Sequence, residues 1–299
     1  MNHAIHRRHF LRTASAAGAA VTLSGLIPSH GLADQVKLST PKAEQLGWRL
    51  SCSLYTFRSV SCYEALDKVA ALGMRGIEPA FFLPLSKDHP DAKTNESLSS
   101  DLRQEWRKKL AERGLRMVNF YGNLTDNAAA NRQIFQFAKE MDVETIVAEP
   151  PAAAFDGIEK LCEEFQINLA VHNHPKTPDY TYWDPDNVAK LFEGRGKRIG
   201  ACCDTGHWVR SGLDSVACLK KMAGRILTVH LKDVIESGNP AARDVPLGTG
   251  KANYTAVLQE LRQQGFRGAL SIEYEHESPQ LMEDVAQCVK FVEQTVASW

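Results

Sequence analysis

Short apolar runs alternate with stretches of helical periodicity along most of this chain. Runs of four to eight residues bounded by turn residues are typical of buried strands, and the intervening stretches are typical of amphipathic helices. The expected strands are Leu50–Phe57, Gly76–Pro79, Arg116–Tyr121, Thr145–Glu149, Ile167–His172, Ile199–Asp204, Ile226–Lys232 and Ala269–Tyr274.

The segments between these runs carry helix signals. Ser61 and Glu64 have capping-box spacing, and Gly73 ends the apolar stripe that follows. Eight strand–helix units in about 250 residues predict a single-domain α/β fold, the (β/α)8 TIM barrel, over residues 34–299. A doubly wound sheet also alternates strands and helices, but a glycine-rich turn is expected after its first strand, and Cys52–Arg58 contains no glycine.

The carboxyl ends of the expected strands are unusually polar, whereas the opposite ends are ordinary. In a TIM barrel the carboxyl ends meet at one rim, where active sites lie. The sequence therefore predicts a functional site built from several strands. The polar end residues are Glu78, Asn119, Glu149, His172 with His174, Asp204 with His207, His230 with Asp233, and Glu273 with Glu275.

Four of these residues predict a metal site. His172, Asp204, His230 and Glu273 end the last four expected strands and supply two imidazoles and two carboxylates. Mixed nitrogen and oxygen ligation suits one Mn²⁺ ion best, with Zn²⁺, Co²⁺ and Fe²⁺ as alternatives. The structural alternative is that some of them are hydrogen-bonded core groups or salt-bridge partners.

The remaining polar residues have more than one interpretation. His174 and His207 are candidate general bases or substrate hydrogen-bond donors, or else loop histidines. Glu149 is a candidate fifth ligand, base or anchor for substrate hydroxyls, or a structural residue. Lys232 is a candidate for stabilising an oxyanion, or a paired barrel lysine. Glu275 is a candidate substrate-binding residue.

Aromatic rings near the rim fit the apolar faces of a sugar. Tyr121 and Trp208 are expected to bind substrate, and Pro246–Gly250 is expected to form a tight loop at the cavity mouth. Other rings in the same region are Phe57, Phe81, Phe82, Tyr182 and Trp183.

The first 33 residues predict a twin-arginine signal peptide. Arg7 and Arg8 precede an apolar stretch from Ala14 to Ile27, and small residues end at Ala33. We therefore expect the mature chain to begin near Asp34, exported by the twin-arginine translocation (Tat) machinery to the periplasm. The alternative, a membrane anchor, is disfavoured because the stretch is shorter than the ~20 residues of a span.

Charge and cysteine content limit the kinds of partner and metal site that we expect for this chain. Removing the three arginines of the signal from the 35 Lys and Arg leaves 32 against 36 Asp and Glu, a formal charge of −4. Nucleic-acid binding is disfavoured because it requires a basic face. Seven cysteines without a CxxC pattern disfavour a cysteine zinc site. Disulfide status stays open, as does oligomeric state, including a homo-oligomer.

Five motifs resemble those of the sugar phosphate isomerase/epimerase group of xylose isomerase-like TIM barrels. The resemblance implies one divalent ion, often manganese, held by His172, Asp204, His230 and Glu273, with His207 at the substrate. It also implies proton removal and return by two metal-binding glutamates. The motifs are VHNHP at 171–175, DTGHW at 204–208, VHLKD at 229–233, PLGTG at 246–250 and SIEYE at 271–275.

One position departs from that family pattern. His172 stands where the family has a glutamate, so His174 or Glu149 would have to replace it as a base. A single-base β-elimination, as in relatives acting on 3-keto-glycosides, then becomes an alternative to epimerisation. No phosphate clamp is evident, which favours an unphosphorylated sugar.

The sequence thus predicts a metal-dependent carbohydrate isomerase or epimerase that works through an enediolate. Glu273 and His174 are the expected proton-transfer groups. The alternatives are a 3-keto-glycoside lyase, a non-catalytic sugar-binding barrel, and a three-zinc hydrolase resembling endonuclease IV. The acidic charge and the export signal argue against the last of these.

Overall fold

The computed structural model describes residues 38–299. The signal peptide expected at residues 1–33, and the cleavage site expected near Asp34, lie outside the described residues and stay predictions. The described residues, 38–299, belong to one compact unit. No helix in the described part of the chain is long and apolar enough to span a membrane.

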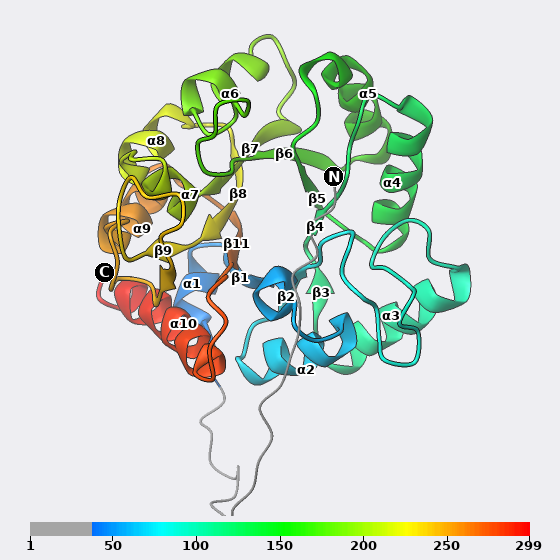
Figure 1. The fold of residues 1–299 in the computed structure, drawn as a ribbon, viewed down its shortest axis with the longest axis horizontal. Coiled ribbons are helices and arrows are strands. Elements are labelled where there is room, and N and C mark those ends of the chain that lie inside the picture. Colours follow the sequence, from blue (N-terminus) through cyan, green and yellow to red (C-terminus); the bar gives the residue numbers. More distant parts are fainter. Residues whose placement is uncertain (1–37) are drawn as a thin grey trace, which may run out of the picture. The chain divides into compact units, whose positions relative to one another are not determined.

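Nine parallel strands form a barrel surrounded by helices (Figure 1). Their order around the sheet is β3-β2-β1-β11-β8-β7-β6-β5-β4, so the first unit pairs directly with the last through β1 and β11, and the two ends of the order are the halves of the third unit. This confirms the predicted TIM barrel. The strands are β1 (Trp48–Ser53), β2 (Gly76–Glu78), β3 (Arg116–Met117), β4 (Asn119–Tyr121), β5 (Thr145–Ala148), β6 (Asn168–His172), β7 (Ile199–Asp204), β8 (Ile226–Leu231) and β11 (Gly268–Ile272).

The third expected strand is divided at Val118. Arg116–Met117 pairs with β2, whereas Asn119–Tyr121 pairs with β5. The Val118 N–H donates to the Ile77 carbonyl at 3.2 Å, and the Val118 carbonyl accepts from Thr145 at 3.3 Å. Val118 therefore hydrogen-bonds to both neighbouring strands, and the two short strands close the barrel where one was expected.

The first expected strand ends earlier than predicted. β1 stops at Ser53, and Leu54–Phe57 form a 3-10 turn, η1. Leu54 and Phe57 stay buried after the strand ends. Because burial continues through the turn, the residue pattern gave no sign of the change in backbone conformation.

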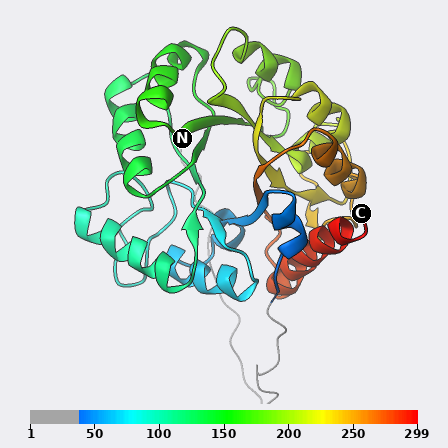
Figure 2. The ribbon, with the colours of Figure 1, turned by 180° about the vertical axis from the view of Figure 1, so that it is seen from behind.

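Helices surround the outside of the barrel, and α2 begins with the predicted capping box between Ser61 and Glu64. Seen from behind, α1 lies beside α10 at the amino end of the barrel (Figure 2). The helices are α1 (Pro41–Gln45), α2 (Cys62–Ala71), α3 (Ser100–Glu112), α4 (Ala128–Glu140), α5 (Phe155–Phe165), α6 (Pro185–Leu191), α7 (Thr205–Arg210), α8 (Ser215–Lys221), α9 (Tyr254–Gln263) and α10 (Leu281–Ala297), with a second 3-10 turn, η2, at Ala152–Ala154.

The barrel interior contains a polar layer below the rim. The Asn119 amide donates to Glu78 Oε2 at 2.9 Å and to Thr228 Oγ1 at 2.8 Å. The Ser271 hydroxyl also donates to Glu78 Oε2, at 2.8 Å. All four side chains are buried. Hydrogen-bonded polar groups thus hold the Glu78 carboxylate directly beneath the rim.

Candidate functional site

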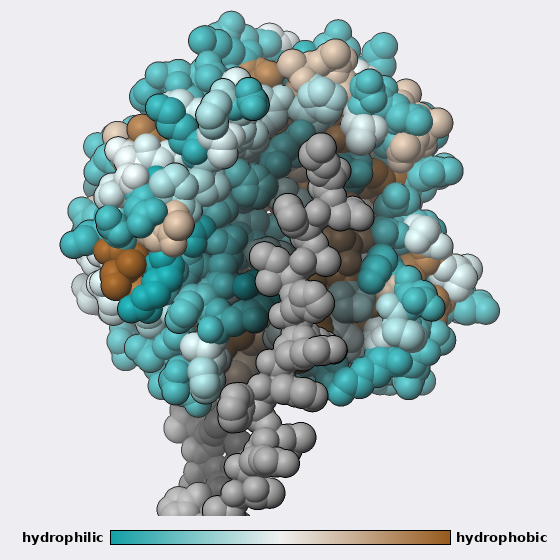
Figure 3. Space-filling model, in the orientation of Figure 1, coloured by the Kyte–Doolittle hydropathy of each residue, from teal (hydrophilic) through white to brown (hydrophobic). Residues whose placement is uncertain are grey.

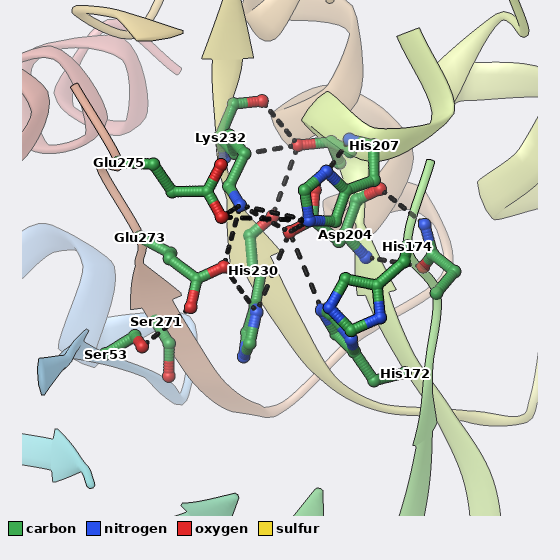
Figure 4. A network of polar contacts seen from close by, with 12 residues as sticks. Ser53, His172, His174, Asp204, His207, His230, Lys232, Ser271, Glu273 and Glu275 are labelled. Atoms are coloured by element: carbon green, nitrogen blue, oxygen red, sulfur yellow. Dashed lines mark hydrogen bonds and ion pairs between the residues drawn. The ribbon is translucent and has the colours of Figure 1, made fainter. Parts of the chain in front are cut away.

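The strand ends expected to carry the site converge at one rim of the barrel (Figure 4). A cavity of about 400 Å³ opens there. Hydrophilic residues lie along the left side of the central hollow of this face, and hydrophobic residues lie along part of its right side (Figure 3). The residues lining the cavity are Ser53, Tyr55, Ala80, Phe82, Tyr121, His172, His174, Pro175, His207, Arg210, Pro240, Glu273 and Glu275.

Three buried polar atoms at this rim have no hydrogen-bond partner in the described structure. They are His172 Nε2, Asp204 Oδ2 and His230 Nδ1. Each of the two histidine nitrogens lies 3.7 Å from Asp204 Oδ2, and Glu273 Oε2 lies 3.3 Å from His230 Nδ1. Buried polar atoms without partners are costly, so such a group needs an explanation.

The donor set fits a divalent ion. Two imidazole nitrogens and two carboxylate oxygens come from β6, β7, β8 and the end of β11. Atoms at these separations can share one ion, because its bonds to nitrogen and oxygen are about 2.0–2.2 Å long. The structure thus brings three of the four predicted ligands, His172, Asp204 and Glu273, within 4.8 Å of one another together with His207. The fourth, His230, lies next to Asp204 and Glu273.

Two carboxylates orient the two histidines. Glu149 Oε1 lies 2.8 Å from His172 Nδ1, and Glu78 Oε1 lies 2.7 Å from His230 Nε2. An ionised carboxylate only accepts hydrogen bonds, so the contacted nitrogens carry the protons. The opposite nitrogens face Asp204 and can offer lone pairs to an ion there once they are deprotonated; although burial lowers the pKa of His172, its carboxylate neighbours Asp204 and Glu149 raise it to about 9. Carboxylates behind metal-binding histidines commonly serve this purpose.

Both carboxylates are ionised. Burial alone would raise the pKa of Glu149, but hydrogen bonds from His172 and His174 outweigh burial and lower that pKa below its ordinary value. Burial likewise opposes ionisation of Glu78, and the neighbouring His230 and Asn119 lower its pKa. Glu78 was noted in the sequence only as a polar strand end, because pairing across the barrel from β2 to β8 leaves no local signal.

Lys232 is buried among three carboxylates. Its Nζ lies 2.7 Å from Glu273 Oε2, 2.9 Å from Glu275 Oε1 and 3.2 Å from Asp204 Oδ2. Burial would lower the pKa of Lys232, but these carboxylates raise it well above the ordinary value, so the ammonium stays charged. Lys232 is therefore a paired barrel lysine placed inside the site.

Gly206 makes room for Lys232. A Cβ at residue 206 would lie 2.5 Å from the Lys232 Cγ and 2.8 Å from its Cβ and Cδ. The glycine of the DTGH motif is thus explained by the close passage of the lysine stem.

His207 lies on the first turn of α7. Its backbone N–H donates to Asp204 Oδ1 at 2.8 Å, which makes Asp204 the N-cap of that helix. Burial lowers the pKa of His207 well below its ordinary value, so the imidazole is neutral. Its Nδ1 lies 3.1 Å from Arg210 Nη1. Arg210 was not predicted, although its spacing of three residues from His207 was visible in the sequence.

His174 shares Glu149 with two other residues. His174 Nδ1 lies 3.1 Å from Glu149 Oε1, and the Tyr121 hydroxyl donates to the same oxygen at 2.9 Å. The His174 side chain is 44% exposed, unlike His172 at 2%. Among the histidines predicted for the site, His174 therefore has the most exposed side chain. Tyr121 and Glu275 also line the cavity, as expected of substrate-binding residues.

Two sequence expectations are wrong about position. Trp208 is buried at 2% exposure and is absent from the cavity lining, because adjacent residues on a helix point to different sides and His207 takes the cavity side. The Pro246–Gly250 loop does not line the cavity either. Its Gly248 and Gly250 N–H groups donate to the Asp233 carboxylate at 3.0 and 2.9 Å.

The family follows from a sequence comparison. Residues 66–293 match the model of the xylose isomerase-like TIM barrel. The chain belongs to that family. A solved structure of an uncharacterized protein from Parabacteroides distasonis is 30% identical to this xylose isomerase-like barrel, with a TM-score of 0.67 over 83% of this chain and 99% of the other.

Curated relatives of this family member match over a shorter length. The rhizopine catabolism protein MocC of Rhizobium meliloti is 34% identical over 131 residues, 39% of each chain. The inosose dehydratase of Geobacillus thermodenitrificans is 31% identical over 140 residues, 41% of this chain and 46% of its own. The chain thus spans less than half the length of each of these relatives.

A more distant neighbour shows the fold alone. The structure of the IOLI protein with a bound zinc atom has a TM-score of 0.64 at 16% identity, and the match covers 84% of this xylose isomerase-like barrel and 97% of that chain.

Proposed function

We propose that this chain is a divalent-metal-dependent enzyme that removes the proton next to a carbonyl of an unphosphorylated carbohydrate and then eliminates the β-oxygen substituent. The observation that carries the proposal is the cluster of orphaned atoms on His172, Asp204 and His230 beside a cavity that holds a separate, exposed histidine. The inosose dehydratase relative supports elimination, because dehydration is an elimination of water.

The metal would be held by His172, Asp204, His230 and Glu273. A divalent ion bound there supplies Lewis acidity that polarises a substrate carbonyl. Two imidazoles and two carboxylates suit Mn²⁺ best, with Zn²⁺, Co²⁺ and Fe²⁺ as alternatives. The zinc in the IOLI structure supports a divalent ion in this fold.

His174 is the proposed base. His174 Nδ1 lies 3.1 Å from Glu149 Oε1, so the carboxylate favours the ring proton on Nδ1 and leaves the lone pair on Nε2 of the exposed ring. Nε2 takes the proton from the carbon next to the carbonyl, and the C–H electron pair forms an enolate. That pair returns as the bond from the β-carbon to its oxygen breaks, and the protonated His174 gives its proton to the departing oxygen. The products are an enone and water or an alcohol.

Isomerisation or epimerisation is the second candidate, with Glu273 as a second base. Glu273 lines the cavity, and its Oε1 has the Ser53 hydroxyl at 2.8 Å as a neighbour. Its Oε2 lies 2.7 Å from the Lys232 ammonium. Because that contact stabilises the carboxylate, Glu273 is a weaker base than His174 for a two-base reaction.

The test is incubation of the metal-loaded protein in D₂O with keto-sugars, keto-cyclitols and keto-glycosides. Elimination gives an enone with ultraviolet absorption, whereas epimerisation gives an isomer of unchanged formula with deuterium at the reacting carbon. His174→Gln should lower kcat by about 10²–10⁴-fold. The matched control is His89→Gln, because His89 is exposed and absent from the cavity lining. Turnover unaffected by His174→Gln would refute the base.

Export to the periplasm is proposed from residues 7–33 alone. Arg7→Lys together with Arg8→Lys should retain the protein in the cytoplasm, while the wild-type chain is recovered from the periplasm in a shortened form. Equal distribution of both proteins between the two fractions would contradict twin-arginine export.

A further inference from the structure

Arg210 is buried beside His207, and all three nitrogens of its guanidinium donate hydrogen bonds. Its Nη2 donates to Asp244 Oδ1 at 2.6 Å, its Nη1 to Glu275 Oε2 at 2.6 Å, and its Nε to the Ala242 carbonyl at 2.9 Å. The side chain is 8% exposed. Contacts on three sides fix the position of Nη1 relative to the His207 ring.

We propose that Arg210 is a positioning residue that holds His207 as the Nε2–H tautomer, which makes His207 a permanent hydrogen-bond donor to a substrate oxygen. His207 Nδ1 lies 3.1 Å from Arg210 Nη1. A guanidinium has five N–H donors, no acceptor, and does not deprotonate in proteins. The Nδ1 atom must therefore accept through its lone pair, and the proton of the neutral ring resides on Nε2.

Lys232 does not use the proton on His207 Nε2. Lys232 Nζ lies 3.3 Å from that nitrogen, but an ammonium is also a donor only. Its ammonium forms ion pairs with the carboxylates of Glu273, Glu275 and Asp204 at 2.7, 2.9 and 3.2 Å, each closer than His207 Nε2. Because these oxygens are the closer and charged acceptors, we assign the ammonium N–H groups to them and keep the imidazole proton on Nε2.

The Nε2–H faces the cavity without a protein acceptor in the described structure. The nearest carboxylate oxygens are Asp204 Oδ2 at 3.6 Å and Glu275 Oε1 at 4.0 Å, beyond hydrogen-bond distance. His207 lines the cavity. A ligand oxygen placed there, such as a carbonyl or its enolate, completes the bond, whereas an ammonium group would meet a second donor.

Two histidines with opposite tautomers thus share one cavity. The carboxylate of Glu149 selects Nδ1–H on His174, and the guanidinium of Arg210 selects Nε2–H on His207. Their ring centroids are 5.3 Å apart. The roles of the two tautomers rest on the proposed function. In that reaction His174 removes the proton, and His207 donates a hydrogen bond to the oxygen on which negative charge develops.

The tautomer can be measured without substrate or turnover. The full chain, labelled with ¹⁵N-histidine and loaded with diamagnetic zinc, should show a protonated Nε2 and an unprotonated Nδ1 for His207 in long-range ¹H–¹⁵N correlation spectra. The signals are assigned by their loss in His207→Gln. A protonated Nδ1 on His207 in the wild-type protein would overturn the proposal.

The substitution Arg210→Met tests whether the guanidinium determines the His207 tautomer. Without the guanidinium, His207 should show partial or full transfer of the proton to Nδ1, whereas Arg103→Met should leave the spectrum unchanged, since Arg103 pairs with Glu140 on the outside of the barrel. An unchanged His207 tautomer in Arg210→Met would overturn the role of Arg210. If Arg210→Met does not fold, the wild-type spectrum still decides the tautomer.

Activity assays of His207 variants distinguish failure of the tautomer assignment from failure of the proposed function. If His207 is a donor, His207→Gln keeps an N–H near Nε2 and should lose less than about tenfold in kcat/KM, whereas His207→Leu should lose about 10²–10³-fold. Equal losses in both variants would contradict a donor role. Absence of carbohydrate turnover, with the predicted spectrum intact, would refute the proposed function and leave the tautomer assignment standing.

Discussion

Replacing Glu78 by glutamine should weaken metal binding although Glu78 is not a ligand. The carboxylate accepts from His230 on Oε1 and from Asn119 and Ser271 on Oε2. A glutamine amide has one acceptor oxygen, so one of these two sides must face an NH₂ group. Either orientation disturbs the site.

The two orientations have different consequences. If the NH₂ group faces His230, that ring must accept through Nε2 and carry its proton on Nδ1, where it blocks the nitrogen that faces Asp204. If it faces Asn119, one N–H of that buried amide loses its acceptor while the other still donates to Thr228, which costs about 1–3 kcal/mol of unfolding free energy. Loss of such an outer partner typically reduces metal affinity about 10–100-fold, equivalent to about 1.4–2.7 kcal/mol.

The assay is titration of chelator-treated protein with Zn²⁺ or Mn²⁺ by calorimetry. Glu260→Gln is a matched control, because Glu260 is a comparably buried glutamate on α9 whose contacts are Gln264 and Lys220. We expect its affinity to equal that of the wild type. Binding by Glu78→Gln within twofold of the wild type would refute the tautomer reasoning.

Three further changes test neighbouring parts of the site. Gly206→Ala places a Cβ 2.5 Å from the Lys232 stem and should destabilise the protein by about 1–3 kcal/mol in chemical unfolding; an unchanged midpoint would contradict that packing. Burial raises the pKa of Asp244 to about 7 against an ordinary 3.8, and Lys232 only partly opposes this. The folded state thus holds the Asp244 proton up to a higher pH than the unfolded chain does, so this group should reduce stability as pH rises from about 4 to 7, by up to about 4 kcal/mol, relative to Asp244→Asn; a flat difference between the two proteins over that range would contradict it. Glu273→Gln should abolish turnover and weaken metal binding while circular dichroism stays unchanged, and full activity would remove Glu273 from the site.

The fold could be predicted because parallel strands and helices differ in periodicity. All eight expected strands are present in order, and the polar strand ends do share one rim. Periodicity could not show that the third strand is divided at Val118, because buried apolar residues lie on both sides of the division, at Met117 and Phe120. It could not mark the end of β1 at Ser53 either, since the turn that follows is packed like a strand.

The site was predictable where each residue follows its own strand. His172, Asp204, His230 and Glu273 do so, and the structure brings them together. The roles of Glu78 and Arg210 depend on contacts across the barrel and along one turn of α7, so strand ends alone could not reveal them.

Side-chain direction explains the two wrong positions. Trp208 follows His207 directly, and helix geometry turns it into the core. The glycines of the Pro246–Gly250 loop serve the Asp233 carboxylate, and a Cβ at residue 250 would lie 2.3 Å from Asp233 Oδ1. A glycine-rich loop beside a barrel rim can therefore be needed for close packing without touching the cavity.

Metal content tests the central claim most directly. The protein should be purified without chelator and measured by elemental mass spectrometry beside Asp204→Asn, in which the shared carboxylate is lost. The proposal predicts about one equivalent of manganese, zinc, cobalt or iron per wild-type chain, and much less in the variant. No metal in the wild-type protein, and no uptake after reconstitution with these ions, would contradict the four-ligand site and the chemistry proposed on it.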